Sequence, residues 1–407
     1  MYLHTSKYRL KRKKKSRFNL PLILLLIALI AAAMYIQVYV VPTVPPLFVP
    51  SPTPTRPAAS YASDAAAMFR EGKLSSATEM YQQAIRLAPT NTDLYIALSR
   101  VQVFAHDFDG AVENASYAVL LSKSALSYAV YGEALYRLEL TKDLPSLEIA
   151  TRQLNKSLDL DPSLALAHAY LAEVLMDTDW QYWEDASEEA RTAITLAPDL
   201  MESHRAMGFV YYKTSNYQEA LEEYLKAIDL HNKLRDLWIP LGDCYQAIND
   251  IIEASNAYVT ASTLDSTDPV PNARLSRLFA GEGDYPKARQ YAELAAALAP
   301  TDPRYHGLLG VMYYHNHQYQ EAIVELGLAV TGGRVEDAIV AGLPLGPFPV
   351  SEYYWTYGLA LAKLDRCAEA VPIFRLLEQQ MPDDEIVVAN VAEGLTICHE
   401  QPPAASE

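Results

Sequence analysis

The sequence predicts an all-α solenoid of about nine helix pairs that follows a single transmembrane helix. Three observations support this prediction. Alanines recur at intervals close to 34 residues over most of the chain, and an uncharged apolar run of 22 residues precedes them. In addition, 407 residues exceed what one compact core usually holds, and half of them are apolar, which is enough to bury an elongated core.

The apolar run extends from Leu20 to Val41, long enough for a helix that crosses about 30 Å of hydrocarbon. Residues 1–19 form a basic tail, so the positive-inside rule predicts a cytoplasmic amino terminus and an extracytoplasmic remainder. A cleaved signal peptide is the alternative, because the three alanines at 31–33 resemble a cleavage site. The apolar run continues beyond them, which favours an uncleaved anchor.

Residues 42–57 contain seven prolines interleaved with Thr, Ser and Val. This composition predicts a semi-rigid polyproline stalk, which at ~3.1 Å per residue spans roughly 50 Å. The remainder of the chain would then stand clear of the membrane surface.

The chain is acidic outside its amino-terminal segment. After Arg56 it holds 24 Lys and Arg against 50 Asp and Glu, a net charge of −26. Such a surface repels phosphate backbones, so nucleic acid is disfavoured as a partner and a partner with a basic face is mildly favoured. Simple solubility is the alternative explanation of this charge.

The repeat is marked by alanines that each begin a similar helical phrase, which reads A-x3-[YA]-x2-A in six of nine copies and is often closed by proline. The intervals between them are 34, 39, 36, 34, 34, 34, 34 and 48 residues. These alanines are Ala77, Ala111, Ala150, Ala186, Ala220, Ala254, Ala288, Ala322 and Ala370.

A second helical pattern precedes several of these phrases and has glycine at its centre. It reads Trp238-x2-Leu241-Gly242-x2-Tyr245 in one copy, and the corresponding glycines elsewhere are Gly132, Gly208, Gly310 and Gly358. Together the two patterns resemble the tetratricopeptide repeat (TPR), W-x2-L-G-x2-Y followed by A-x3-F-x2-A and proline. The resemblance covers residues 58–398 and implies a right-handed superhelix with a carboxy-terminal capping helix. Residues 399–407 are expected to be a disordered tail.

In this family the first helix of each pair lines the inner groove. Mapping that stripe onto this chain gives aromatic residues beside cations, a mixture that suits an extended peptide. An ordinary solvated face is the alternative for each residue. The predicted groove residues are Arg205, Phe209, Tyr212, Lys213, Arg277, Arg304, Tyr314, His315, Trp355 and Lys363.

The largest departure from the repeat is a Gly- and Pro-rich insertion at 338–351, which is either a binding loop or a tolerated surface excursion. Cys367 precedes a second helix and Cys398 ends the capping helix. Because equivalent loops lie on one edge of a solenoid, we expect these two sulfurs to form a disulfide, with two free thiols as the alternative. Cys244 lies within the repeat signature and is expected to be a small buried residue.

The histidines do not indicate a metal site. His168, His204 and His306 occupy the slot where the repeat places Trp, and no Cys or Glu completes a known ligand spacing beside His315 and His317. The chain also lacks a phosphate loop, an HExxH and a GxSxG motif. We therefore expect neither an enzyme nor a bound metal or cofactor.

The resemblance to anchored repeat scaffolds of bacterial envelopes implies a membrane-bound scaffold that holds proteins or peptides outside the membrane. One alternative is a receptor for glycans or other small ligands that uses Phe209, Tyr212, Tyr314 and Trp355. Another is a non-catalytic accessory subunit of an envelope enzyme. The chaperone-binding Lys and Asn clamp of one TPR subclass is not supported, because Ala66, Arg100 and Glu133 occupy slots of that clamp.

Overall fold

The computed structural model describes residues 19–40, 56–142 and 145–399. The chain divides into two units, residues 1–56 and 57–407. The predicted basic tail and carboxy-terminal tail lie almost entirely outside the described residues, and so does most of the predicted stalk.

The amino-terminal unit contains one apolar helix. Helix α1 (Leu20–Tyr35) continues into a π-helical turn, η1 (Ile36–Val40), and neither contains a charged residue. The stretch Leu20–Tyr39 is long and apolar enough to cross a membrane. A signal sequence near the amino terminus meets the same criteria of length and composition, so these 20 residues fit a membrane span or a signal sequence.

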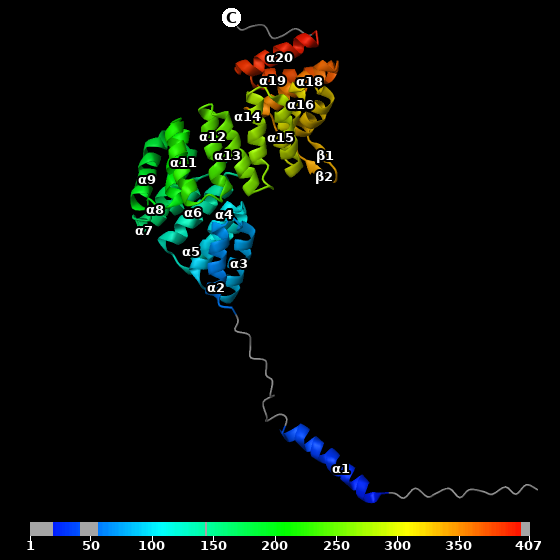
Figure 1. Cartoon of the computed structure of the whole chain (residues 1–407). Coiled ribbons are helices and arrows are strands. Elements are labelled where there is room, and N and C mark those ends of the chain that lie inside the picture. The colour runs from blue at the N-terminus through cyan, green and yellow to red at the C-terminus, as the bar shows by residue number, and fades with distance from the viewer. Residues whose placement is uncertain (1–18, 41–55, 143–144, 400–407) are drawn as a thin grey trace, which may run out of the picture. The chain divides into compact units, whose positions relative to one another are not determined.

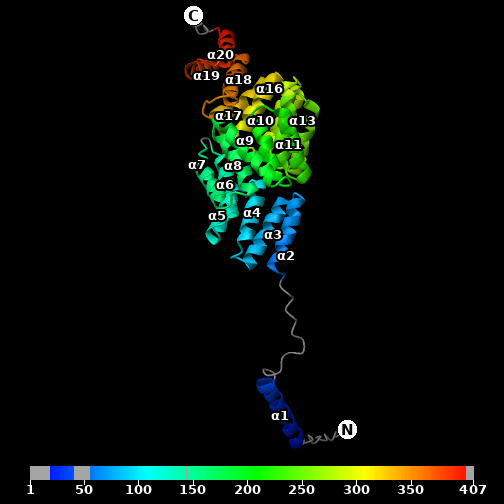
Figure 2. The same ribbon diagram turned by 90° about the vertical axis from the view of Figure 1, so that its left-hand side faces the viewer.

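Within its described residues, the second unit consists of nine consecutive helical hairpins and a final single helix, as the repeat predicts (Figure 1). Figures 1 and 2 place the first hairpin and the last helices at opposite ends of this unit. The helices are α2 (Ala58–Arg70), α3 (Leu74–Leu87), α4 (Thr92–Phe104), α5 (Phe108–Leu121), α6 (Ala125–Glu139), α7 (Glu148–Leu160), α8 (Ala165–Thr178), α9 (Trp183–Leu196), α10 (Met201–Lys213), α11 (Tyr217–Leu230), α12 (Arg235–Ala247), α13 (Ile251–Leu264), α14 (Val270–Gly281), α15 (Tyr285–Leu298), α16 (Pro303–His315), α17 (Tyr319–Thr331), α18 (Val350–Lys363), α19 (Cys367–Gln380) and α20 (Glu385–Ile397). A short 3-10 helix, η2 (Trp180–Tyr182), lies between α8 and α9.

The signature residues explain why the helices pair. The alanines that begin each phrase are at most 1% exposed, and the glycine of the first helix faces an aromatic ring of the second in several copies. A Cβ atom at Gly242 would lie 2.5 Å from the ring of Tyr258, and one at Gly358 would lie 2.6 Å from the ring of Phe374. Glycine is required at these positions because any side chain would push the two helices apart.

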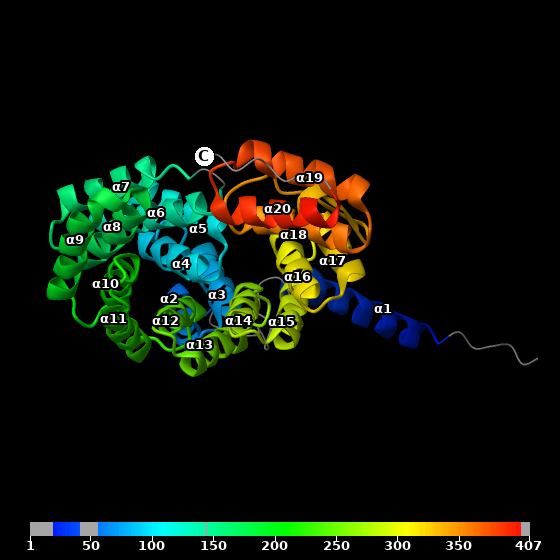
Figure 3. The same ribbon diagram turned by 90° about the horizontal axis from the view of Figure 1, so that it is seen from above.

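The solenoid curves so that its first turn closes on itself. Figure 3 shows α8 and α10 on the inside of the curve and α7, α9 and α11 on the outside. The end of α2 reaches the segment before α12, where the ring centres of Phe69 and His231 lie 5.0 Å apart. Arg100 Nη2 lies 2.6 Å from Glu202 Oε1, although the two residues are 102 positions apart. The inner face of this turn is therefore occupied by the chain's own side chains.

Gly72 allows this closure. Its φ of +75° is in the left-handed region, and a Cβ there would lie 2.8 Å from the carbonyl oxygen of Lys233. Gly283 has the same backbone conformation, φ +77°, with no atom near the position of its Cβ. We expect Gly72→Ala to lower the free energy of unfolding by about 1–3 kcal/mol more than Gly283→Ala, because only the first adds a collision to the backbone strain. Urea denaturation of the two variants measures the difference, and equal losses would show that the closure tolerates a methyl group.

The insertion begins earlier than the predicted 338–351. Strands β1 (Gly333–Val335) and β2 (Ala338–Val340) form an antiparallel hairpin in which Gly333 pairs with Val340. The chain then runs to the start of α18 at Val350, and the Tyr354 hydroxyl donates a 2.7 Å hydrogen bond to the carbonyl of Leu343. This bond holds the segment against the solenoid.

Candidate functional site

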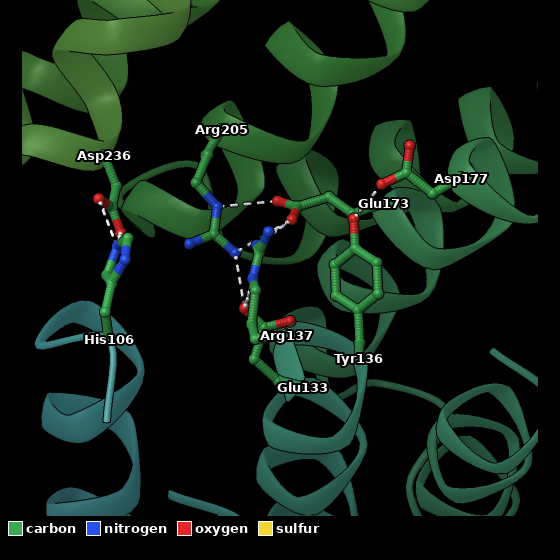
Figure 4. A network of polar contacts seen from close by, with 8 residues as sticks. All are labelled: His106, Glu133, Tyr136, Arg137, Glu173, Asp177, Arg205 and Asp236. Atoms are coloured by element: carbon green, nitrogen blue, oxygen red, sulfur yellow. Dashed lines mark hydrogen bonds and ion pairs between the residues drawn. The ribbon is translucent and has the colours of Figure 1, made fainter. Parts of the chain in front are cut away.

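An ion cluster occupies the inner face of the first superhelical turn (Figure 4). It consists of Glu133 and Arg137 from α6, Glu173 from α8 and Arg205 from α10. Arg205 Nε lies 2.8 Å from Glu173 Oε1, and Arg205 Nη2 lies 3.2 Å from Glu133 Oε1. Arg137 Nε lies 2.9 Å from Glu133 Oε1, and Arg137 also pairs with Glu173. Two cations and two anions thus neutralise each other.

Burial makes these ion pairs internal to the fold. Glu133 is 2%, Glu173 3% and Arg205 7% exposed. Burial alone would lower the pKa of Arg205, but the nearby carboxylates of Glu173 and Glu133 outweigh it and raise that pKa. Arg205 is a predicted groove cation, but its charge is neutralised by Glu133 and Glu173 inside the fold.

A central cavity of about 380 Å³ lies beside the ion cluster. Its walls come from α4–α6, α8 and α10–α12, and the predicted residues Arg205 and Phe209 both line it. At one side His106 Nε2 lies 3.0 Å from Asp236 Oδ1, which ties the end of α4 to α12 (Figure 4). The volume of this cavity suits a small group better than a long peptide.

A second hollow, the arginine pocket, lies on the first helices of later repeats and has a volume of about 370 Å³. Three arginines, two tyrosines and several apolar side chains surround it. Its lining residues are Val270, Ala273, Arg274, Arg277, Arg304, Tyr305, Leu308, Pro349, Val350 and Tyr353. It contains two of the predicted groove residues, Arg277 and Arg304.

The three arginines of this pocket differ in their partners. Arg304 holds both carboxylate oxygens of Asp302, with Nη2 2.6 Å from Oδ2. Arg274 Nε lies 3.2 Å from Asp243 Oδ1, but the two atoms are not aligned for a hydrogen bond. Among the described residues Arg277 has no carboxylate within 4.0 Å, and its Nη2 donates only a long 3.4 Å bond to the Tyr353 hydroxyl.

The insertion places an aromatic ring near Arg277. The guanidinium carbon of Arg277 lies 6.0 Å from the centre of the Phe348 ring, which is 62% exposed. The adjoining residues Pro349 and Val350 line the pocket itself. The pocket therefore offers a cation that forms no ion pair with the described residues and lies near aromatic rings, in a chain whose net charge is −17.

The other predicted groove residues do not join either hollow. Lys213 Nζ lies 2.8 Å from Asp177 Oδ1, and Tyr212 packs against Tyr217. Lys363 lies 3.8 Å from Glu393, and His315 stacks on Tyr285 and touches Tyr314. Trp355 is only 8% exposed and packs in the core with Phe374 and Leu395, so it offers no open ring to a ligand.

Histidines occupy the position where the repeat usually has Trp, and they make equivalent structural contacts in different repeats. His306 Nδ1 lies 2.6 Å from Glu325 Oε2, and its Nε2 lies 2.9 Å from the carbonyl oxygen of Pro300. The hydrogen bond with Glu325 raises the pKa of His306. His204 contacts Glu223 and the Pro198 carbonyl in the same way. Each such histidine links a first helix to the following helix and to the turn before it.

Two of the three cysteines are bonded to each other, and the third is buried. In the structure Cys367 and Cys398 form a disulfide that joins the start of α19 to the end of α20, with their Cα atoms 5.5 Å apart. Cys244 is buried, and burial raises the pKa of its thiol to about 12.

One group of exposed aromatic residues was not predicted from the sequence. Trp180 and Trp183 lie in the turn between α8 and α9 and are 58% and 41% exposed. The signal in the sequence is the interval of 36 residues between Ala150 and Ala186, since the longer turn contains three aromatics within four residues.

No protein-family model matches the chain, and no curated protein matches it. Among solved structures, a thermophilic TPR protein of Thermus thermophilus has a TM-score of 0.40 at 20% identity and covers 46% of this chain and 99% of its own. The pilF protein of Pseudomonas aeruginosa has a TM-score of 0.42 at 23% identity over 50% and 89%, and a TPR protein of Parabacteroides merdae has 0.41 at 14% over 63% and 98%. From its own repeat signature and its nine helix pairs, the described chain from Ala58 to Ile397 is a tetratricopeptide-repeat solenoid.

Proposed function

We propose that the chain is a membrane-anchored, extracytoplasmic scaffold that binds an extended acidic peptide of a partner protein. The observation that carries this proposal is Arg277, a cation without a carboxylate partner among the described residues, in a pocket walled by Tyr305, Tyr353 and apolar side chains. A peptide carboxylate would pair with the guanidinium, while a neighbouring apolar side chain would rest on the rings. The scaffold binds and does not catalyse.

The proposed location follows from the amino-terminal segment. An apolar helix of spanning length follows a tail with eight Lys and Arg, which favours retention of that tail in the cytoplasm. Proteinase treatment of intact bacterial spheroplasts tests it, with the chain detected by a tag after Glu407. Digestion of a membrane-bound chain supports the proposed topology, and protection until lysis would place the solenoid in the cytoplasm.

The peptide proposal is tested with a fluorescent hexapeptide of alternating Asp and Leu and a matched peptide of alternating Lys and Leu. We expect the acidic peptide alone to bind, and Arg277→Gln to weaken it about 10- to 100-fold, since a charge-assisted hydrogen bond contributes about 1.5–3 kcal/mol. Fluorescence anisotropy measures both affinities.

Arg289→Gln is the matched control. Arg289 lies on α15, outside the pocket, and pairs with Glu293 at 3.4 Å. It should leave the affinity unchanged. Equal affinity of the wild-type and Arg277→Gln chains, or an equal loss in Arg289→Gln, would show that the arginine pocket is not the peptide site.

The alternative of a glycan receptor is not favoured at the four aromatics predicted for it. Phe209 lines the central cavity and Trp355 is buried, so these residues and the two tyrosines do not present one surface.

A further inference from the structure

The turn between α8 and α9 exposes more aromatic surface than the fold requires. Trp180, Tyr182 and Trp183 fall within four residues and are 58%, 36% and 41% exposed. The other two tryptophans differ: Trp355 is buried, and Trp238 donates a 3.1 Å hydrogen bond from Nε1 to the Asn232 carbonyl. An exposed cluster of large aromatic rings is typical of a binding surface.

These tryptophans border a hollow of about 360 Å³, which we name the aromatic edge site. It is built where the α8–α9 hairpin meets the α10–α11 hairpin. Its lining residues are Trp180, Trp183, Ser187, Arg191, Tyr211, Thr214 and Asn216. Aromatic rings and polar groups make up this lining, and no residue with a purely aliphatic side chain belongs to it.

Several polar groups of the site have no partner among the described residues. The guanidinium of Arg191 makes no hydrogen bond or ion pair with them, and neither do the indole N–H groups of Trp180 and Trp183. Asn216 Nδ2 donates to Thr214 Oγ1 at 2.9 Å, which leaves the carbonyl oxygen of the amide unused. The site thus combines flat rings with available donors and an available acceptor.

We propose that the aromatic edge site binds a neutral pyranose glycan. One face of a pyranose ring presents C–H groups that pack on an aromatic face, while its hydroxyls both donate and accept hydrogen bonds. Trp180 and Trp183 supply the faces, Arg191 and the indoles supply donors, and the Asn216 amide supplies an acceptor. A pocket for an aliphatic peptide side chain usually combines aliphatic with aromatic groups, and this lining holds no purely aliphatic residue.

The charges near the aromatic edge site favour a neutral ligand over an acidic one. Helix α9 carries Glu184 and Asp185 in its first turn and Glu188 one turn later, next in sequence to the lining residues Trp183 and Ser187, so carboxylates on this part of the helix outnumber Arg191. This local field repels polyanionic glycans and anionic lipid surfaces. The site differs from the arginine pocket in its residues and ligand, and it does not depend on the proposed peptide function.

The test uses the full chain in a detergent without a sugar head group and a neutral N-acetylglucosamine hexasaccharide, with binding measured by calorimetry. We expect Trp180→Ala and Trp183→Ala each to weaken binding at least tenfold, and Arg191→Gln to weaken it several-fold. Tyr117→Ala, which removes a ring that is 47% exposed on α5, is the matched control and should change nothing. Arg277→Gln should also bind the hexasaccharide normally.

An acidic hexasaccharide of alternating glucuronate and N-acetylglucosamine completes the design. It should bind at least tenfold more weakly than the neutral one. The proposal is overturned if the neutral hexasaccharide does not bind the wild-type chain, if the tryptophan variants bind it as well as wild type, or if Tyr117→Ala loses as much. Tighter binding of the acidic sugar, or of the Asp-Leu hexapeptide, at this site would also overturn it.

Discussion

Arg205→Met is expected to lower the free energy of unfolding of the first superhelical turn by about 3–5 kcal/mol. Methionine has a similar length but no charge, so Glu133 and Glu173 would remain buried beside Arg137 alone. Two carboxylates against one guanidinium leave an uncompensated buried charge, which is the costly situation in a protein interior. Urea denaturation followed by hydrogen exchange in α6, α8 and α10 measures the loss.

A double variant separates the ion pair from simple packing. Arg205→Met with Glu173→Met removes one cation and one anion, and leaves Arg137 and Glu133 paired at 2.9 Å. We expect it to be clearly more stable than Arg205→Met, because the cluster is neutral again. Arg191→Met, at a cation without partners among the described residues, should change stability by less than about 0.5 kcal/mol. A double variant as unstable as the single one would mean that packing, and not charge, explains the loss.

The repeat made the fold predictable. Each signature specifies a local helical hairpin, and equivalent contacts recur in several copies. Gly242 against Tyr258 and Gly358 against Phe374 are two instances of the same contact. Repeats stack on their neighbours through short-range contacts, which a period in the sequence is sufficient to indicate. The nine pairs and the capping helix were confirmed for this reason.

The 34-residue period of the sequence does not predict that the first superhelical turn closes on itself. It depends on contacts such as His106 with Asp236, which are 130 residues apart and belong to no repeated position. In the sequence Glu202 and Asp236 look like ordinary acidic residues of a solvated helix. The groove mapping assumed an open inner face, and it therefore placed Arg205 on a surface that the closed turn buries.

The groove prediction was most informative where the solenoid stays open. Arg277 and Arg304 do share a pocket, because α14, α16 and α18 present equivalent faces side by side. The contribution of the insertion was not foreseeable, since a non-repeating segment has no template from which to place Phe348. Trp355 occupies a first-helix position, but the packing of α18 against α19 and α20 covers it.

Loss of the disulfide should have the other large effect on stability, and it should be local. The Cys367–Cys398 bond has a sequence separation of 31 residues, and on the chain-entropy model a loop of that length is worth about 3–4 kcal/mol. Cys398→Ser should therefore destabilise α18–α20 by about that amount. Because repeats are stabilised mainly by their neighbours, amide protection in the earlier hairpins should change little.

Hydrogen exchange with and without dithiothreitol measures this effect. Reduction of the wild-type chain should reproduce the loss seen in Cys398→Ser, whereas dithiothreitol should not alter the variant further, since Cys244 is a buried thiol that forms no disulfide. Unchanged protection of α19 and α20 after reduction would show that the bond does not stabilise the cap. A loss that spread through all hairpins would show instead that the solenoid unfolds as one cooperative unit, with the cap as its weakest end.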